Sequence, residues 1–264
     1  RGAMVLPDHV VGAARDGDIR VVEAWLDGTG PGAINDKAEW GGTLLMSCLH
    51  SSIFERHVHF ARWLIARGAD VNLGKSNGCS PLHYASFPGN CSSTMVSLLL
   101  ASGARVNART NGDLQTPLGQ LIDEFDYCLG EADEDDRAAT QRQISRSGLE
   151  ILMLLLRAGA SLDRCQYDSS AEELMQEFLS YRPHYANDDS FARCQEIVAG
   201  VRAHGSYKAY VREPHRQFLR LRSLLVRGRA KVRGRSKSSQ RLERLARLPN
   251  GACWHVLSFL WEAA

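Results

Sequence analysis

Apolar residues recur at helical spacing in three segments of the chain, and these segments end in similar ways. Residues 60–72 read FARWLIARGADVN, residues 95–107 read MVSLLLASGARVN, and residues 148–163 read GLEILMLLLRAGASLD. Each pattern predicts an amphipathic helix that ends at a glycine, where a left-handed backbone is needed, followed by an extended exit. Such an internal period favours a stack of repeated units, because one unit cannot bury its own apolar face.

A second helix start is predicted upstream of each segment. A hydroxyl side chain stands there, at Thr43, Ser80 or Thr116, and can cap a helix by accepting a backbone N–H hydrogen bond. Pro81 and Pro117 follow at the first helical position, where the missing N–H costs nothing. Each unit is therefore expected to contain two helices joined by a short turn.

The opening SPLHYAS at 80–86 and the close GADVN at 68–72 resemble the signature of the ankyrin repeat. The resemblance covers residues 6–163. It implies an all-α ankyrin-repeat solenoid of stacked helix pairs with a C-terminal helical extension, and loops that project as fingertips. It also implies that His83 hydrogen-bonds neighbouring backbone, a framework role. The first unit, 6–35, is expected to be a degenerate cap, since terminal repeats are atypical.

The repeat pattern loosens in the second half of the chain. Residues 6–163 are expected to hold about four repeats, the last with an insertion at 123–147 whose centre, GEADEDD at 130–136, is acidic. This insertion is either a solvated loop between the two helices of its repeat or an acidic contact surface. Residues 164–205 are expected to form a degenerate fifth repeat.

Within that fifth repeat, a helix is predicted to begin in the segment from Tyr167 to Leu174, with a serine cap and early acids. A second helix is predicted over residues 190–204. The loop between them, 182–189, is longer than the ankyrin resemblance implies.

Residues 206–264 form a separate C-terminal helical module in this interpretation. Residues 207–227 carry an apolar stripe that we expect to pack on the array, and a basic linker follows at 227–241. The chain's net charge is only +2, although Lys and Arg are concentrated in this module. Nucleic-acid binding is disfavoured because no aromatic residue stands between Arg222 and Arg247 to stack on bases. A nuclear-localisation role and a solvated linker remain as alternatives.

The end of the chain, 248–261, resembles the opening of an F-box, in which a Leu-Pro start leads into a helix that docks a ubiquitin-ligase adaptor. It is also similar to the tails of ankyrin proteins from unicellular algae and poxviruses. Asn250 and Gly251 depart from that pattern. The segment either docks such a partner or caps the last repeat. The residues assigned to docking or capping are Leu248, Pro249, Trp254, Val256, Leu257, Leu260 and Trp261.

The sequence predicts no catalytic, cofactor-binding or metal site. It contains no GxGxxG, GxxxxGK[ST], HExxH or GxSxG motif. His57 and His59 are two residues apart and would point to different faces of a helix, so His50, His57 and His59 are interpreted as surface or repeat-face residues. The seven cysteines form no CxxC pair, which favours reduced thiols.

The sequence contains no run of roughly 18 apolar residues that would predict a membrane span. It also shows no apolar N-terminal segment that would predict a signal peptide. A cytoplasmic or nuclear location is therefore expected. The leading hypothesis is a non-enzymatic scaffold that binds an unidentified protein through its concave face and fingertips. A ubiquitin-ligase adaptor and a structural subunit of a larger assembly are the alternatives. The candidate contact residues are Glu39, Trp40, Lys75, Ser76, Asn77, Thr110, Asn111 and Asp113. Trp40 is the strongest candidate because tryptophan is enriched in binding hot spots, although it could instead pack beneath the next fingertip.

Overall fold

The computed structural model describes residues 5–49, 55–88, 93–125 and 137–227. It divides into two compact units, Arg1–Ala203 and His204–Ala264. The α-helices of the first unit are α1 (Asp8–Asp16), α2 (Ile19–Thr29), α3 (Leu44–Leu49), α4 (Glu55–Ala66), α5 (Pro81–Ala85), α6 (Ser93–Ala101), α7 (Pro117–Asp123), α8 (Arg137–Arg157), α9 (Ala171–Tyr181) and α10 (Asp189–His204). The described residues also contain the 3-10 helices η1 (Pro31–Asn35) and η3 (Pro183–Asn187).

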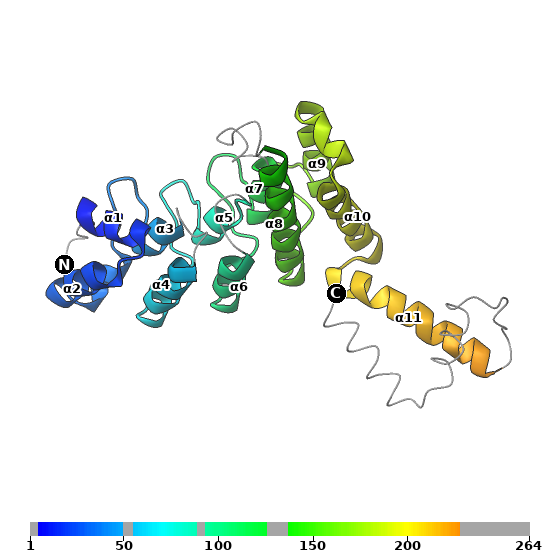
Figure 1. Ribbon diagram of the computed structural model, residues 1–264, viewed down its shortest axis with the longest axis horizontal. Helices are drawn as coiled ribbons and strands as arrows, with labels where there is room; N and C mark the ends of the chain where they lie inside the picture. The colour runs from blue at the N-terminus through cyan, green and yellow to red at the C-terminus, as the bar shows by residue number, and fades with distance from the viewer. Residues whose placement is uncertain (1–4, 50–54, 89–92, 126–136, 228–264) are drawn as a thin grey trace. The chain divides into compact units, whose positions relative to one another are not determined.

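The helices of the first unit stack as pairs in two rows (Figure 1). Helices α1, α3, α5, α7 and α9 contact one another in succession and form the inner row. Helices α4, α6 and α8 do the same on the outer row, and each pairs with the inner helix that precedes it. This arrangement confirms the predicted all-α solenoid of stacked helix pairs.

The predicted helix starts and stops are found where the sequence places them. The hydroxyls of Thr43 and Thr116 accept hydrogen bonds from backbone N–H groups three residues later, at 3.3 and 3.1 Å. Ser80 is the N-cap of α5, with Pro81 at its first position. The backbone angle φ is +95°, +89° and +94° at Gly68, Gly103 and Gly159. Glycine enters this left-handed region without the steric penalty of a Cβ, so it allows each turn to leave its helix sharply.

The core runs along the stack as matching apolar positions of successive units. Leu44, Leu82 and Leu118 lie at the start of three inner helices and are fully buried. Leu64, Leu99 and Leu155 fill the corresponding space from the outer helices and are also fully buried. Because such positions lie between successive helix pairs, each repeat is stabilised mainly through its interfaces with the adjacent repeats.

The insertion at 123–147 is partly helical. Helix α8 begins at Arg137, well before the apolar segment that starts at Gly148. The added turns are fixed by burial of Ile144 and Ser145, which face the interior of the unit. The acidic stretch 130–136 lies outside the described residues, so its two interpretations stay predictions.

The long loop at 182–189 carries an aromatic residue into the core. It contains η3, and Tyr185 within it is fully buried. The ring of Tyr185 lies 5.9 Å from Phe125, 5.1 Å from Phe178 and 5.9 Å from Phe191, measured between centroids. Aromatic pairs at such distances add stabilisation beyond the area they bury. The length of this loop therefore serves packing in the last repeat.

The second unit contains α11 (Tyr207–Val226) within its described residues. That the apolar stripe of this helix packs on the array stays a prediction. Residues 228–264 are not described, so nearly all of the basic linker 227–241 and the whole F-box-like segment 248–261 lie outside the described part. Within the described residues, none of the helices combines the length and apolar character needed to cross a membrane.

Candidate protein-binding surface

Loops between successive helix pairs close as short hairpins, which we call fingers. In each finger a backbone N–H near the start donates to a carbonyl near the end. The closing pairs are Ala38–Gly42 at 2.9 Å, Lys75–Cys79 at 3.0 Å, Thr110–Gln115 at 3.0 Å and Cys165–Ser169 at 2.7 Å. Residues 165–169 therefore form a finger that precedes the fifth pair of helices, α9 and α10. The helix predicted to begin within 167–174 is confirmed, because α9 starts at Ala171 with Ser170 as its cap and acids in its first turn, and Tyr167 lies before it in the finger.

An asparagine at the base of each of the first three fingers ties one repeat to the next. The Asn72 side-chain amide donates to Gly103 O at 3.1 Å, and its carbonyl accepts from Arg105 N at 2.8 Å. Asn35 makes the same pair of bonds to the following repeat, as does Asn107. Because the same two bonds recur, the spacing between fingers is fixed by side chains as well as by helix packing.

The fingertips are also bonded to one another. Asn111 donates from its backbone to Asn77 O and from its side chain to Ser76 O, both at 2.7 Å. Further along, Tyr167 N donates to Asp113 O at 2.8 Å. The Arg109 guanidinium donates to the carbonyls of Arg164 and of Tyr167, which holds the 165–169 finger from below. The described fingers after the first therefore form a connected and pre-ordered surface.

The predicted contact residues fall into three groups on this surface. Glu39, Ser76, Asn77 and Asn111 are exposed, while Lys75 and Asp113 are half-buried. Thr110 does not fit its assignment as a contact residue. It is buried at 7% exposure, and its hydroxyl hydrogen-bonds with Asp113 and Gln115 within its own finger. A threonine that closes a hairpin is not available to a partner.

Trp40 is half-buried and packs within the fingers. Its ring covers Gly42 so closely that a Cβ on that residue would lie 1.8 Å from a ring atom. Lys75 Nζ lies 4.5 Å from the Trp40 ring centroid and 4.8 Å from that of Tyr84, and it donates to the Tyr84 hydroxyl. These cation–π contacts favour the alternative in which Trp40 packs against the adjacent finger.

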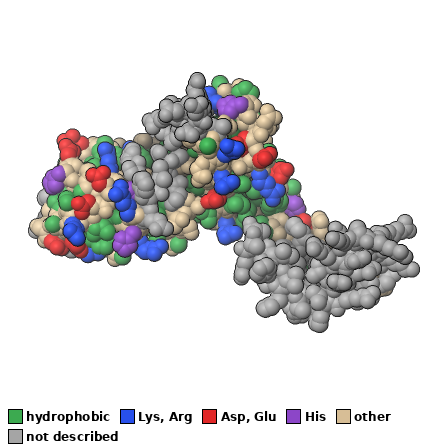
Figure 2. Space-filling view, in the orientation of Figure 1, with side chains coloured by type: hydrophobic (Ala, Val, Ile, Leu, Met, Phe, Trp, Pro, Cys, Tyr) green, Lys and Arg blue, Asp and Glu red, His purple; other side chains and the backbone are tan. Residues whose placement is uncertain are grey.

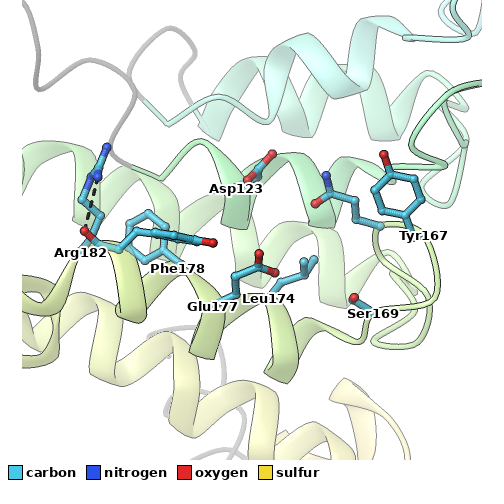
Figure 3. Close-up of a pocket in the computed structure, with 9 residues that line it drawn as sticks. Asp123, Tyr167, Ser169, Leu174, Glu177, Phe178 and Arg182 are labelled. Atoms are coloured by element: carbon cyan, nitrogen blue, oxygen red, sulfur yellow. Dashed lines mark hydrogen bonds between the residues drawn. The ribbon is translucent and has the colours of Figure 1, made fainter.

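A pocket opens between α7 and α9 beside the 165–169 finger, with a volume of about 360 Å³ (Figure 3). Leu174 and Phe178 of α9, both 7% exposed, form its floor. Asp123 of α7 and Glu177 of α9 are exposed and extend into the space between the two helices. Tyr167 and Tyr181 line its rim at 60% and 69% exposure, and Arg182 stands at the end opposite Tyr167. The pocket combines an apolar floor with charged and aromatic side chains, as binding grooves for peptides do.

The two fingers nearest this pocket hold non-glycine residues in the left-handed region. The backbone angle φ is +54° at Leu114 and +48° at Tyr167. Leu114 is the residue before the last one in its finger. Gly41 and Gly78 take the same place in the two earlier fingers, with φ of +81° and +80°. Left-handed non-glycine residues persist where the surroundings over-determine them, and they cluster at binding sites. Leu114 is also exposed, at 37%.

The pocket residues Asp123, Leu174, Glu177, Tyr181 and Arg182 were not predicted from the sequence, and neither was the finger that contains Tyr167. A signal for Tyr167 was present, because GASLD at 159–163 corresponds to GADVN at 68–72, after which a finger follows. Residues 165–169 could therefore have been recognised as a finger with an aromatic tip. The carboxylates of α7 and α9 offered no such signal, since only the stacking of the two helices brings them together.

Buried titratable groups serve the framework. His83 Nδ1 accepts from Ser80 N at 3.1 Å, so Nε2 carries the proton and donates to Gln115 O at 3.0 Å. This confirms the framework role implied for His83, and burial lowers the pKa of its imidazole. His57 corrects the sequence interpretation, because it is fully buried and its Nε2 lies 2.8 Å from Arg15 O. It bridges α4 to the end of α1, a role that its two-residue spacing from His59 did not indicate.

Three of the described thiols, those of Cys79, Cys165 and Cys194, are poor nucleophiles. Burial raises the pKa of Cys79 and of Cys165 to about 11, and that of Cys194 to about 12. A thiol with such a pKa stays protonated at neutral pH, whereas the thiolate is the reactive form. Among the described residues there is also no cluster of three or more His, Cys, Asp or Glu side chains suited to a metal ion.

The fold and the fingers define an all-α repeat protein whose loops form a continuous surface. Residues 10–110 match the family model of ankyrin repeats (3 copies), so this part of the chain consists of ankyrin repeats. The asparagine and finger geometry continues beyond residue 110 through the pair Asn107 and Ser161. Charged side chains of both signs are interspersed on the described face of the array shown in Figure 2. Ankyrin repeats generally serve as protein–protein interaction modules.

Proposed function

We propose that this protein is a non-enzymatic interaction scaffold that binds another protein through the inner-row helices and the fingers. The observation that carries the proposal is the pocket between α7 and α9, whose rim includes the exposed Tyr167 ring on a finger held by Arg109. A finger whose backbone is ordered before binding loses little conformational freedom in the complex. Tyrosine is also enriched among residues that dominate binding energy.

The proposal is tested by affinity capture from source cells with three forms of the chain, followed by quantitative mass spectrometry. The forms are the intact protein, a chain ending at residue 205, and the intact protein with Tyr167→Asn. Asparagine tolerates the left-handed backbone, so this substitution removes the ring while it keeps the finger conformation. Circular dichroism establishes that the shortened and substituted chains remain folded.

We expect the same partners on the intact and shortened chains, and at least a tenfold loss with Tyr167→Asn, equivalent to about 1.4 kcal/mol. The matched control is Val21→Ala, which shortens an exposed apolar side chain on α2, away from the pocket. Partners that are retained by Tyr167→Asn but lost from the shortened chain would place binding in the second unit and contradict the proposal.

A ubiquitin-ligase adaptor is the second candidate function, and the sequence of 248–261 favours it. In that case this protein is the substrate adaptor: its array binds a client protein, while Leu257 and Leu260 contact the adaptor subunit of the ligase itself. The test is a pull-down of adaptor proteins with the intact chain and with Leu257→Asp/Leu260→Asp. Adaptor binding to the intact chain that the double substitution abolishes would support this function. Equal binding to both chains would exclude it.

A further inference from the structure

We infer that the pocket between α7 and α9 receives an extended segment of a partner protein that presents an Arg or Lys side chain beside an apolar one. The inference rests on the proposed function and names the chemistry of the partner at the same site. It follows from the side chains along the pocket: Tyr167 lies at one end, Asp123 and Glu177 lie in the middle, and Phe178 and Arg182 lie at the other end (Figure 3).

The middle of the pocket is negatively charged. Asp123 ends α7, and Glu177 lies on the facing side of α9, so the two carboxylates approach the same space from different helices. Asp123 accepts one hydrogen bond, from the Gln115 side chain at 3.1 Å, and the described residues give neither carboxylate an ion pair. Carboxylate oxygens have further lone pairs to offer, so an Arg or Lys cation placed between them could donate hydrogen bonds to both.

Nearby acids of the same elements are already engaged elsewhere. Glu172 pairs with Arg202 at 2.8 Å, Asp168 pairs with Arg164 at 3.0 Å, and Glu173 bonds the Ser170 hydroxyl at 2.8 Å. Asp123 and Glu177 differ from Glu172 and Asp168 in lining a cavity without an ion pair among the described residues. Their charge is therefore available to a ligand.

The ends of the pocket set the direction of the segment. Tyr167 provides an exposed ring at one end, and Leu174 below it offers apolar area, so an apolar side chain of the partner fits there. Arg182 stands at the other end, with one guanidinium nitrogen 3.4 Å from Tyr181 O. The expected order along the segment is an apolar side chain at the Tyr167 end, followed by a basic one.

The experiment uses the intact protein and an oriented peptide library. The central position of the library is fixed as Arg, Lys, Leu or Glu, and its flanking positions are random. The most enriched peptide is then labelled, and its affinity is measured by fluorescence anisotropy at low and high salt. The test variant is Asp123→Asn/Glu177→Gln, which preserves side-chain size and the hydrogen bond from Gln115. The matched control is Asp27→Asn/Glu150→Gln, which removes the same charge from exposed positions on α2 and α8.

We expect enrichment of Arg or Lys at the centre and an affinity about tenfold lower for the test variant, with the control unchanged within about twofold. Higher salt should weaken binding to the unsubstituted protein more than to the test variant, since salt screens the ion pairs. Enrichment of Glu or Leu, enrichment of nothing, or an equal loss in both double variants would overturn the inference.

Two further outcomes separate this inference from the function on which it rests. A captured partner that is lost with Tyr167→Asn but kept by Asp123→Asn/Glu177→Gln leaves the proposed function standing and overturns the basic segment. A partner whose binding is unaffected by Tyr167→Asn and by Asp123→Asn/Glu177→Gln would contradict both the proposed function and the basic segment. Substitution of Lys231, Arg233, Arg235 and Lys237 by serine should leave peptide affinity unchanged. Tighter peptide binding by that variant would assign the pocket to the chain's own basic linker and overturn a partner segment.

Discussion

The hydroxyl of Ser145 on α8 donates a hydrogen bond of 2.9 Å to the carboxylate of Asp188, the residue that precedes α10. The other carboxylate oxygen of Asp188 accepts from Phe191 N at 2.8 Å and so caps α10. Ser145 lies in the N-terminal extension of α8, and Asp188 lies in the long loop 182–189. The two departures from the regular repeat are therefore joined to each other inside the unit.

Removal of this contact should destabilise the last repeat, because Ser145 is fully buried. We expect Ser145→Ala to cost about 1 kcal/mol, the typical net value of one hydrogen bond. Asp188→Ala should cost about 2 kcal/mol, because it leaves the serine hydroxyl without its acceptor and also removes the cap of α10. Urea unfolding of the two single variants and the double variant measures the coupling. Strictly additive losses would show that the bond contributes nothing to stability.

Gly148 allows α8 to approach the aromatic cluster of the last repeats. A Cβ on this residue would lie 2.5 Å from a ring carbon of Phe125. That ring cannot move away freely, because its centroid lies 5.1 Å from that of Phe191 and 6.1 Å from that of Phe178. We expect Gly148→Ala to lower the free energy of unfolding by about 1–2 kcal/mol, since overpacking outweighs the better helix propensity of alanine.

The matched control for that variant is Gly12→Ala in α1. Gly12 is also inside a helix, but a Cβ there would meet no atom within 4 Å. This substitution should raise the free energy of unfolding by up to about 1 kcal/mol through helix propensity alone. Thermal unfolding of both variants decides the matter, and a stabilised Gly148→Ala would show that the Phe125 cluster yields easily.

Most of the fold could be predicted from the sequence, because local chemistry determines it. Ser80, Pro81 and Gly103 each act within one or two turns of their own helix, so the helix pairs and their stacking are visible in a single repeat. His57 was misread because its burial depends on Arg15, 42 residues away. The length of α8 was underestimated for a similar reason, since Ser145 is retained in the core by Asp188, which is 43 residues away.

The candidate site was less predictable than the fold. The finger positions were found, but exposure within a finger depends on the neighbouring finger, as Thr110 and Trp40 show. The pocket needs Asp123 and Glu177 together, and they lie on two helices that contact only through stacking. Asp123 ends α7 and Glu177 lies within α9, and nothing in the sequence marked these two residues as neighbours across a pocket.

His83 should make stability depend on pH below its ordinary titration range. Burial lowers the pKa of its imidazole below 6.5, the usual value, so the unfolded chain binds a proton more readily than the folded one. The stability contributed by neutral His83 is therefore present above about pH 6.5 and is lost as the pH falls towards the lowered pKa. Protonation would also remove the lone pair with which Nδ1 accepts from Ser80 N.

Urea unfolding at about pH 7 and about pH 5.5 measures this effect, compared between the unsubstituted protein and His83→Asn. The variant should be less stable at both pH values but should lose less on acidification. The other histidines are the same in both proteins, so the difference in slope reports His83. Parallel pH curves would contradict the prediction.

We expect the left-handed backbone of Leu114 to lower stability and its side chain to contribute to binding. Its φ of +54° is a left-handed conformation that costs a non-glycine residue about 1 kcal/mol or more, and asparagine bears that cost best among residues with a Cβ. We therefore compare Leu114→Asn with Leu114→Ala. Both remove the same apolar side chain, which is 37% exposed, so the buried area lost is similar in the two variants. The asparagine variant should be more stable than the alanine variant by about 0.5–1 kcal/mol, because only the backbone preference differs.

Binding should respond to the side chain rather than to the backbone. Leu114 lies in the finger that Tyr167 N contacts through Asp113 O, beside the pocket of α7 and α9. If the leucine is kept in a strained conformation for its contact with a partner, both variants should bind the enriched peptide or captured partner about threefold to tenfold more weakly. Unchanged affinity in both variants, together with a more stable Leu114→Asn, would show that the strain at this finger has no part in binding.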